Sequence, residues 1–361
     1  MSSIHAPAEI LRSFCADCFV KLGVPPAAAD VTADNLVFAN LRGVDSHGVI
    51  RLKIYCERLR LGGFNAKARP SLIGEQDSTA LLDGGGGIGQ VTALRAMEIA
   101  LEKAARTGAG FVTARNSNHF GACAFFALKA VERGMIGLAA TNAGPTMAPT
   151  GGRERRLGNN AFAVAIPAGR HSPIVLDMAT GAAAWGKIFV AQQENKKIPT
   201  TWALDKSGVP TDDPNKAADG GLIQPFGGYK GYGLSLLLDI LTGVLSGGAF
   251  STKIKTLYQE IGSPAEVAHL CAAVRVDSFL PAAEFRQRMD AMIDLLHSSA
   301  RAAGTDRIFV PGEIEFETER RRREEGIPIN PSLRDELSTM AAALAIPNPF
   351  EKLSPATRAG Q

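Results

Sequence analysis

The sequence predicts an α/β fold in which a β-rich core lies between helical segments at the two ends of the chain. From about residue 80 onward, short apolar runs typical of strands alternate with amphipathic helical patterns, as they do in α/β cores. Before residue 62 and after residue 331, apolar residues instead recur at helical spacing. The fold class follows from this change of periodicity along the chain.

The individual elements follow from the same periodicity and from glycine and proline breaks. Helices are expected over 7–22, 25–41, 50–61, 90–106 and 122–133, and strands over 110–114, 136–141, 161–166, 174–176 and 306–310. The apolar stretch over 232–250 approaches the length of a membrane span, but Asp239 near its centre favours a buried core helix. The last helix is expected to begin at Ser332, where Ser-x-x-Asp335 matches a capping box.

We expect two parts in this arrangement. Residues 1–75 should form a helical N-terminal part that packs with C-terminal helices over 314–361, and residues 76–313 should form the β-rich core. The chain has 361 residues, 45% of them hydrophobic, which is enough to bury a large core.

Charge and cysteine content exclude several classes of function. The chain carries 39 basic and 36 acidic residues and a net charge of +3, which is too balanced to indicate nucleic acid as a partner. The run Arg320–Arg323 follows glutamates at i,i+4 spacing and predicts a solvated helix face. Met1 to Glu9 lacks a secretory pattern, so we expect a cytoplasmic protein with no membrane partner. Five cysteines without framework spacing indicate reduced thiols, and no metal-ligand motif is present, so we expect no metal.

The segment Asp45–Arg51 contains a candidate proton-transfer residue next to a candidate anion clamp. Histidine exchanges protons near neutral pH, which suits His47 to acid–base chemistry. Arginine grips a carboxylate with two hydrogen bonds, and Arg51 at the start of the third helix can point back towards His47. The alternative interpretation is a surface loop capped by Ser46.

A glycine run, Gly84–Gly89, invites a different interpretation. It contains G-x-G-x-x-G between a short strand and a helix, which is the context of a dinucleotide-binding fingerprint, and the next strand ends in Arg115. Four consecutive glycines match many patterns by chance, however, and the strand before them is short. Pyrophosphate binding at this loop is therefore one hypothesis, and a plain connecting loop is the other.

Five further segments carry groups suited to catalysis or ligand binding, each next to a strand or helix end. His119 lies in a loop between a strand and a helix, and Asn142 follows the next strand. Asp177 follows an apolar strand, where it can orient a histidine or cap a helix over 180–188. Lys230 stands between glycines before the long apolar helix and is suited to a phosphate. The turn at 311–313 offers a close backbone approach, and a simple turn is the alternative interpretation for it and for the loops of His119 and Asn142.

Taken together, these residues resemble the type-2 malate/L-lactate dehydrogenase family, which also holds sulfolactate, ureidoglycolate and diketogulonate enzymes and reductases of cyclic imino acids. The resemblance covers roughly residues 5–350. The matching segments, in order, are Asp45-Ser46-His47-Gly48 with Arg51, Ser117–Gly121, Leu157–Asn160, Leu176–Ala179, Gly186-Lys187, Gly228–Leu234 and Pro311–Glu313.

The resemblance implies an NAD(P)-dependent oxidoreductase on a non-Rossmann fold, working as a homodimer with sites near the subunit interface. In such enzymes the residue matching His47 transfers the substrate proton and that matching Arg51 holds a carboxylate. His119 competes for the proton role; we favour His47, oriented by Asp177. The expected substrate residues are Ser46, Arg51 and Tyr55, and the expected cofactor residues are Gly121, Asn142, Asp177, Met178, Ala179, Lys230, Arg307, Pro311, Gly312 and Glu313. The family segment that matches 84–89 does not bind the pyrophosphate.

Two departures from the family pattern bear on the cofactor. Family members often have serine where Gly181 stands and proline where Ala161 follows Asn160. The missing hydroxyl at Gly181 leaves NAD and NADP open, with NAD slightly favoured. The leading hypothesis is reversible hydride transfer between the nicotinamide and a small 2-hydroxy or 2-oxo carboxylate. A reductase of cyclic 2-imino acids is the first alternative, and a non-catalytic nucleotide-binding protein is the second.

Overall fold

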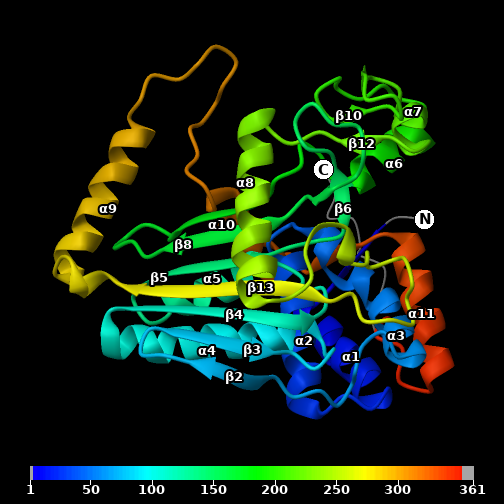
Figure 1. The fold of residues 1–361 in the computed structure, drawn as a ribbon, viewed down its shortest axis with the longest axis horizontal. Coiled ribbons are helices and arrows are strands. Elements are labelled where there is room, and N and C mark those ends of the chain that lie inside the picture. Colours follow the sequence, from blue (N-terminus) through cyan, green and yellow to red (C-terminus); the bar gives the residue numbers. More distant parts are fainter. Residues whose placement is uncertain (1–2, 352–361) are drawn as a thin grey trace.

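A computed structural model describes residues 3–351 and has a mixed seven-stranded sheet at its centre (Figure 1). The strand order is β2-β3-β4-β13-β5-β8-β9, and only the β3–β4 pair is parallel. These strands are β2 (Ser71–Glu75), β3 (Thr79–Asp83), β4 (Ala109–Ser117), β5 (Met135–Thr141), β8 (Ala161–Ile166), β9 (Ile174–Ala179) and β13 (Val267–Arg275). A doubly wound dinucleotide fold has a parallel sheet, so the predicted α/β class with a non-Rossmann core is confirmed.

Helices cover both faces of this sheet. Helices α4 (Gly89–Thr107) and α5 (Cys123–Val131) pack on one face through small residues such as Ala139 and Ala163. Helix α8 (Tyr229–Asp239) crosses the other face, where Ala140 and Leu270 meet it (Figure 1). Side chains alternate between the two faces along a strand, which is why neighbouring residues such as Ala139 and Ala140 serve different helices.

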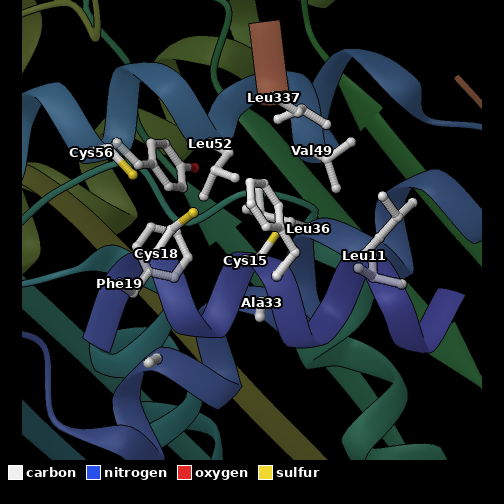
Figure 2. Packing of buried hydrophobic residues seen from close by; sticks show 14 of the residues in the cluster. Leu11, Cys15, Cys18, Phe19, Ala33, Leu36, Val49, Leu52, Cys56 and Leu337 are labelled. Carbon is white, nitrogen blue, oxygen red and sulfur yellow. The ribbon is translucent and has the colours of Figure 1, made fainter. Parts of the chain in front are cut away.

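The two ends of the chain pack together in a separate apolar cluster (Figure 2). Strand β1 (Ile4–Ala6) pairs with β14 (Ile327–Ile329). The helices that share this cluster are α1 (Ala8–Lys21), α2 (Pro26–Leu41), α3 (Leu52–Leu61) and α11 (Pro331–Leu344). All five cysteines are free and buried, as predicted. Helix α10 (Glu313–Glu325) also contacts α2. The division into two parts remains a prediction, with one difference in detail: β2 precedes residue 76 and yet belongs to the large sheet.

A small lobe and a peripheral helix complete the chain (Figure 1). The lobe has its own apolar cluster and contains α6 (Trp185–Gln193), α7 (Pro214–Ala218), β10 (Ala203–Leu204), β11 (Pro210–Thr211) and β12 (Leu222–Ile223). Strands β6 (Pro145–Met147) and β7 (Leu157–Gly158) pair beside it, and α9 (Ala282–His297) lies at the other side of the molecule. None of the helices in residues 3–351 is long and apolar enough to cross a membrane.

Four local predictions are wrong. Residues 306–310 form no strand, and the helix expected over 180–188 begins only at Trp185. Helix α11 is capped by Asn330, whose side chain accepts the Leu333 N–H, because Pro331 occupies the first helical position. The long apolar helix is not buried all round: α8 continues into a π-turn over Ile240–Val244 and exposes an apolar face. That face consists of Leu236, Leu237, Ile240, Val244 and Leu245.

Candidate active site

The segment carrying His47 and Arg51 is a pair of 3₁₀ turns, Asp45–His47 and Val49–Arg51, that leads into α3. Arg51 Nε donates to the Ser46 carbonyl oxygen at 2.7 Å, so its guanidinium points back over the turn as predicted. Ser46 Oγ and His47 Nδ1 are 3.0 Å apart. The turn thus presents an imidazole and a guanidinium on the same side.

Side chains of α2 and α10 hold this turn in place. Asn40 Oδ1 accepts the Val49 N–H at 2.8 Å, and Asn40 Nδ2 donates to Asp45 at 2.6 Å. A side chain on Gly48 would collide with the Asn40 amide, so glycine is required there. Arg322 of α10 makes two hydrogen bonds to Asp45, at 2.7 and 3.0 Å. This contact gives a structural role to Arg322, which belongs to the run predicted to form a solvated helix face.

His119 lies beside His47, although the two are far apart in the sequence. Their rings stack with centroids 5.6 Å apart and planes inclined by 22°. Tyr55 Oη and His119 Nδ1 are 2.6 Å apart, and the Gly121 N–H reaches the same nitrogen at 3.3 Å. Because the Gly121 N–H can only donate, Nδ1 must accept, and the proton of the neutral ring resides on Nε2. The structure therefore brings His47, Arg51, Tyr55 and His119 together.

Burial changes the proton affinity of both histidines. Desolvation and the nearby charge of Arg51 lower the pKa of His47 to about 4. Desolvation, followed by repulsion from His47 when that ring is protonated and from the charge of Arg51, holds the pKa of His119 well below its usual range. Both rings are thus neutral in the free protein at neutral pH. A bound carboxylate on Arg51 would offset part of that positive charge and would make a protonated His119 less costly.

Asp177 does not contact either histidine. It lies on β9 and is exposed, and its one hydrogen bond among the described residues comes from the Ala124 N–H of α5, at 3.0 Å. The protein groups around it raise its pKa to about 6 through desolvation, which the Ala124 hydrogen bond and the charge of Arg42 oppose. The expected coupling of Asp177 to His47 is therefore absent, and so is the alternative role as a cap of 180–188. Asp177 instead caps the helix that follows the His119 loop.

The glycine loop at 84–89 is filled by protein rather than open to a ligand. Asn118 Nδ2 donates to the carbonyl oxygens of Gly86 and Gly87, at 2.9 and 2.8 Å. A Cβ on Gly84 would lie 2.9 Å from the Asn116 carbonyl oxygen, and a Cβ on Gly89 would collide with the backbone of Asn118 and His119. These glycines allow the loop to pack against the segment that carries His119, which leaves no room for a pyrophosphate.

Comparison with known proteins shows the family to which the chain belongs. The family model for malate/L-lactate dehydrogenase matches residues 6–338. The chain belongs to this family. A malate dehydrogenase from Pyrococcus horikoshii is 42% identical over 95% of this chain and 96% of its own length, and an L-sulfolactate dehydrogenase from Methanocaldococcus jannaschii is 39% identical over 91% and 94%. The ureidoglycolate dehydrogenase (NAD(+)) of Escherichia coli is 32% identical over 89% and 91%.

Solved structures agree with the sequence comparison. The malate dehydrogenase structure from Pyrococcus horikoshii superposes with a TM-score of 0.88 at 40% identity, covering 96% of this chain and 97% of that one. The sulfolactate dehydrogenase structure from Methanocaldococcus jannaschii gives 0.89 at 38% identity, covering 95% and 98%. The family resemblance drawn from the sequence motifs is therefore confirmed, and the chain is a dehydrogenase.

The residues expected to bind the dehydrogenase's cofactor fall into two groups, and the first is engaged inside the protein. The amide of Asn142 is fully used: Nδ2 donates to Asp239 and to the Ala249 carbonyl oxygen, and Oδ1 accepts the Ala268 N–H. Gly121 has a positive φ of 78°, and a Cβ there would collide with Asn35 Oδ1. The backbone is engaged as well: the Asn142 N–H donates to the Ala268 carbonyl oxygen at 3.2 Å, and the Gly121 N–H is directed at His119 Nδ1.

The second group is open or forms a turn. Met178 and Ala179 end β9, and the following Thr180 carbonyl oxygen accepts the Phe226 N–H, which brings the start of α8 close to the strand end. Lys230 is exposed in the first turn of α8 and has no hydrogen bond or ion pair within residues 3–351. The Pro311 carbonyl oxygen accepts the Val175 N–H of β9 at 2.9 Å, so the 311–313 turn packs on the same strand.

Charged side chains hold that turn in place. Glu313 accepts the Val310 N–H at 3.0 Å and lies 3.0 Å from His297 Nε2, and a Cβ on Gly312 would press on Val175. Arg307 pairs with Glu317 at 2.6 Å and stacks over Phe309. Within the described chain, no cluster of three or more histidine, cysteine or carboxylate side chains could hold a metal ion.

The sequence analysis missed several residues that support the site. Gln90 Nε2 donates to Tyr55 Oη at 3.1 Å, and Asn35 exchanges two hydrogen bonds with the backbone of Ala122. Tyr258 contacts the guanidinium of Arg51. Arg58 donates to the carbonyl oxygens of Leu257 and Ser263 and so holds the Tyr258 loop. The sequence signal that could have identified such residues is an isolated polar residue within an apolar helical pattern.

Buried His269 has a structural role beside the site. It is fully buried between Thr141 Oγ1 and Ser117 Oγ, at 3.0 and 2.9 Å, and its ring stacks on Phe120 with centroids 4.7 Å apart. Burial lowers its pKa to about 3, so it remains neutral. Because Phe120 follows His119 directly, this stack fixes the backbone of the His119 loop.

Proposed function

We propose that the protein catalyses reversible hydride transfer between NAD and a small 2-hydroxy or 2-oxo carboxylate. The observation that carries this proposal is the joint position of Arg51, His47 and His119, which offers a carboxylate clamp next to proton-transfer groups. The names of the relatives support the substrate class, since malate and sulfolactate are 2-hydroxy acids. The nicotinamide supplies or accepts the hydride when it is bound.

Arg51 holds the substrate carboxylate in this proposal, and Tyr258 moves aside from the guanidinium to allow it. Ser46 and Tyr55 border the same space. His119 transfers the proton through Nε2, which faces the substrate because Tyr55 and Gly121 occupy Nδ1. In reduction the imidazolium gives its Nε2 proton to the substrate oxygen and keeps the Nδ1 proton, which Tyr55 Oη accepts; oxidation starts from that Nδ1-protonated neutral ring. We prefer it to His47 because Asp177, the expected orienting group for His47, caps α5 instead.

The cofactor in this proposal spans the ends of β9 and α8. Lys230 has no partner among the described residues and lies two residues after Gly228, whose φ is positive. It offers a cation, and the start of α8 offers backbone N–H groups, both of which suit a phosphate. Residues 177–179 and 311–313 line the rest, with Asn142 and Gly121 behind them as structural support. NAD is favoured over NADP because Arg307 is already paired with a carboxylate, and one relative is named for NAD(+).

We further propose that the enzyme is a homodimer. The exposed apolar face of α8 supports this, and so does a hollow of about 280 Å³ beside it, lined by Tyr232, Leu236, Ile240, Val244 and Phe250. Light scattering on the purified protein tests the mass in solution. Ile240→Asp is expected to give monomers, whereas a monomeric unmodified protein would contradict the proposal.

The activity itself is tested by mixing purified protein with NADH or NADPH and a panel of 2-oxo acids and cyclic imino acids, followed at the nicotinamide absorbance. Oxidation of NADH by a 2-oxo dicarboxylate is the expected result. Turnover of cyclic imino acids alone would reassign the substrate, and cofactor binding without any turnover would indicate a non-catalytic protein. His119→Gln should abolish turnover; full loss in His47→Gln with an active His119→Gln would move the proton role to His47.

A further inference from the structure

The side chain of Gln90 is buried beside the site and only partly satisfied. It is fully inaccessible to solvent; its Nε2 donates to Tyr55 Oη at 3.1 Å, and its Oε1 has no hydrogen-bond partner. An unpartnered buried carbonyl oxygen costs about 1–3 kcal/mol. Such an oxygen calls for an explanation, because nearly all buried polar atoms in folded proteins are paired.

Gln90, Tyr55 and His119 form one chain of hydrogen bonds. Gln90 Nε2–H donates to Tyr55 Oη, whose own proton goes to His119 Nδ1, and the Gly121 N–H assists at the same nitrogen. Tyr55 is fully buried, and its neighbours among the described residues leave its hydroxyl no other acceptor. This direction of donation fits only the neutral His119 ring that carries its proton on Nε2.

Protonated His119 requires the chain to run the other way. Imidazolium carries a proton on Nδ1 as well, so Tyr55 Oη must accept it and must give its own proton elsewhere. Gln90 Oε1 is the acceptor within the same side chain: rotation of the amide by half a turn exchanges Nε2 and Oε1. Because one amide atom lacks a partner in either orientation, the rotation adds no further unpaired group.

We propose that Gln90 is a positioning residue whose amide, through Tyr55, supports both the resting His119 ring, which carries its proton on Nε2, and the two forms used in turnover. Those forms are the imidazolium and the neutral ring left when Nε2 gives up its proton, and both carry a proton on Nδ1 that Tyr55 Oη accepts. This inference rests on the proposed role of His119 in proton transfer. It assigns the unpartnered oxygen a purpose: it is the acceptor that the protonated state needs. The low pKa of His119 fits this assignment, since the orientation with Nε2 donating to Tyr55 is the one that favours the neutral ring.

The glycine run explains how Gln90 reaches this position. Gly89 begins α4 against the backbone of Asn118 and His119, where any side chain would collide. Gln90 follows directly and so enters the space between α3 and the His119 loop. The amide also lies against Gly121: a Cβ there would come within 3.1 Å of Gln90 Nε2. The segment that resembles a dinucleotide fingerprint thus serves the proton-transfer side of the site.

Two substitutions of similar shape separate this role from a purely structural one. Gln90→Glu provides an acceptor only, when ionised, so Tyr55 donates to it and the protonated His119 is favoured. Gln90→Met removes the acceptor, so the protonated state loses its partner for Tyr55. We expect the titration midpoint of His119 to rise by about one pH unit in Gln90→Glu and to fall in Gln90→Met. We expect kcat for reduction to fall by about tenfold in Gln90→Met.

The measurement is ¹⁵N chemical shift titration of labelled histidine in the unliganded protein, with His119 assigned by its loss in His119→Gln. The unmodified protein should show an unprotonated Nδ1 and a protonated Nε2 at neutral pH. Thr92→Val, another buried polar residue of α4, is the matched control and should leave the midpoint unchanged. Midpoints that move in the same direction in both Gln90 variants, or do not move, would overturn the proposal.

This readout needs no turnover, so it remains informative if the proposed activity is absent. A His119 tautomer as expected without any dehydrogenase activity would reject the proposed function and retain the role of Gln90 toward the ring. Loss of the expected tautomer with normal activity would reject the role of Gln90 and retain the proposed function. Thermal unfolding of each variant shows whether its fold is intact. Gln90→Asn replaces any variant that unfolds, and we expect it to shift the titration midpoint of His119 in the same direction as Gln90→Met.

Discussion

Two glycine-rich segments precede helices in this chain, and they differ in what surrounds them. The glycines of 84–89 precede α4 and pack against the backbone of 116–119. Gly227 and Gly228 precede α8 with positive φ values of 57° and 66°, and a Cβ on either would meet nothing within 4 Å. The first segment better matches a nucleotide-binding pattern, yet a Cβ on Gly84, Gly87 or Gly89 would come within 3.0 Å of protein atoms, whereas the second segment is open at both glycines. Glycine spacing alone therefore does not identify a phosphate site.

The largest expected effect of a change in these segments is at Gly89. Gly89→Ala places a methyl group on the carbonyl oxygens of Asn118 and His119, neither of which can move without displacing the site. We expect a loss of about 3 kcal/mol in the free energy of unfolding, measured by urea denaturation, and loss of turnover. A stable, active Gly89→Ala enzyme would show that the first segment is not a packing device.

Lys230 tests the second segment. Lys230→Gln should raise the KM for NADH by about tenfold, equivalent to about 1.4 kcal/mol, while the melting temperature stays the same. Arg115 is the matched control, because a Rossmann-type interpretation would give it the phosphate. It pairs with Asp83 at 3.6 Å, and Arg115→Gln should leave the KM for NADH unchanged. The opposite ranking of the two variants would return the cofactor to the first segment.

The loop against which 84–89 packs carries His119, and the burial of both site histidines predicts the pH dependence of the reaction. Oxidation of a hydroxy acid requires a neutral imidazole with Nε2 unprotonated, and burial lowers the pKa of His47 to about 4 and that of His119 well below its usual range. The neutral forms therefore persist as pH falls, and kcat/KM for oxidation should have no acid limb at the ordinary histidine pKa of about 6.5. A limb near pH 6 that disappears in Asp177→Asn would belong to Asp177, whose pKa is raised to about 6. A limb at 6.5 that survives in Asp177→Asn would contradict the assignment.

The smallest expected effect is at Gly233, which lies within α8 beyond the second segment. It has no positive φ, and a Cβ there would meet nothing within 4 Å. Gly233→Ala should therefore raise the free energy of unfolding by about 0.5–1 kcal/mol, because alanine restricts the unfolded chain and favours helix. Thermal unfolding compares it with Gly89→Ala: the two substitutions are chemically identical and should have opposite signs.

Much of the fold was predictable because local patterns decided it. The helices α1, α2, α4 and α5 and the strands β4, β5 and β8 begin and end close to the expected residues, since each has a clear period and a break. The wrong predictions lie where contacts with other segments of the chain determine the local structure. The 306–310 segment is held by Glu313 and Arg307 side chains rather than by a sheet, and β2 joins the sheet through a bulged pairing with β3.

The residues of the candidate site were predictable from the sequence, but the hydrogen bonds that they make were not. His47, Arg51 and His119 were singled out by type and by family resemblance, and they do lie together. Their partners were not predictable. Asp177 reaches the Ala124 N–H and not a histidine, and Asn142 is consumed by Asp239 and backbone groups. Hydrogen-bond partners depend on distances of a few tenths of an ångström between segments far apart in the chain.

By itself, the sequence determined the α/β class and the family and singled out the candidate site side chains, because periodicity and ordered motifs are local properties. Only the tertiary structure decided which glycine-rich segment is filled and which is open, since that depends on whether another part of the chain occupies the space. It also decided which nitrogen of His119 is left for a substrate. That choice follows from the approach of Tyr55, Gln90 and Gly121, which three separate elements bring to one ring.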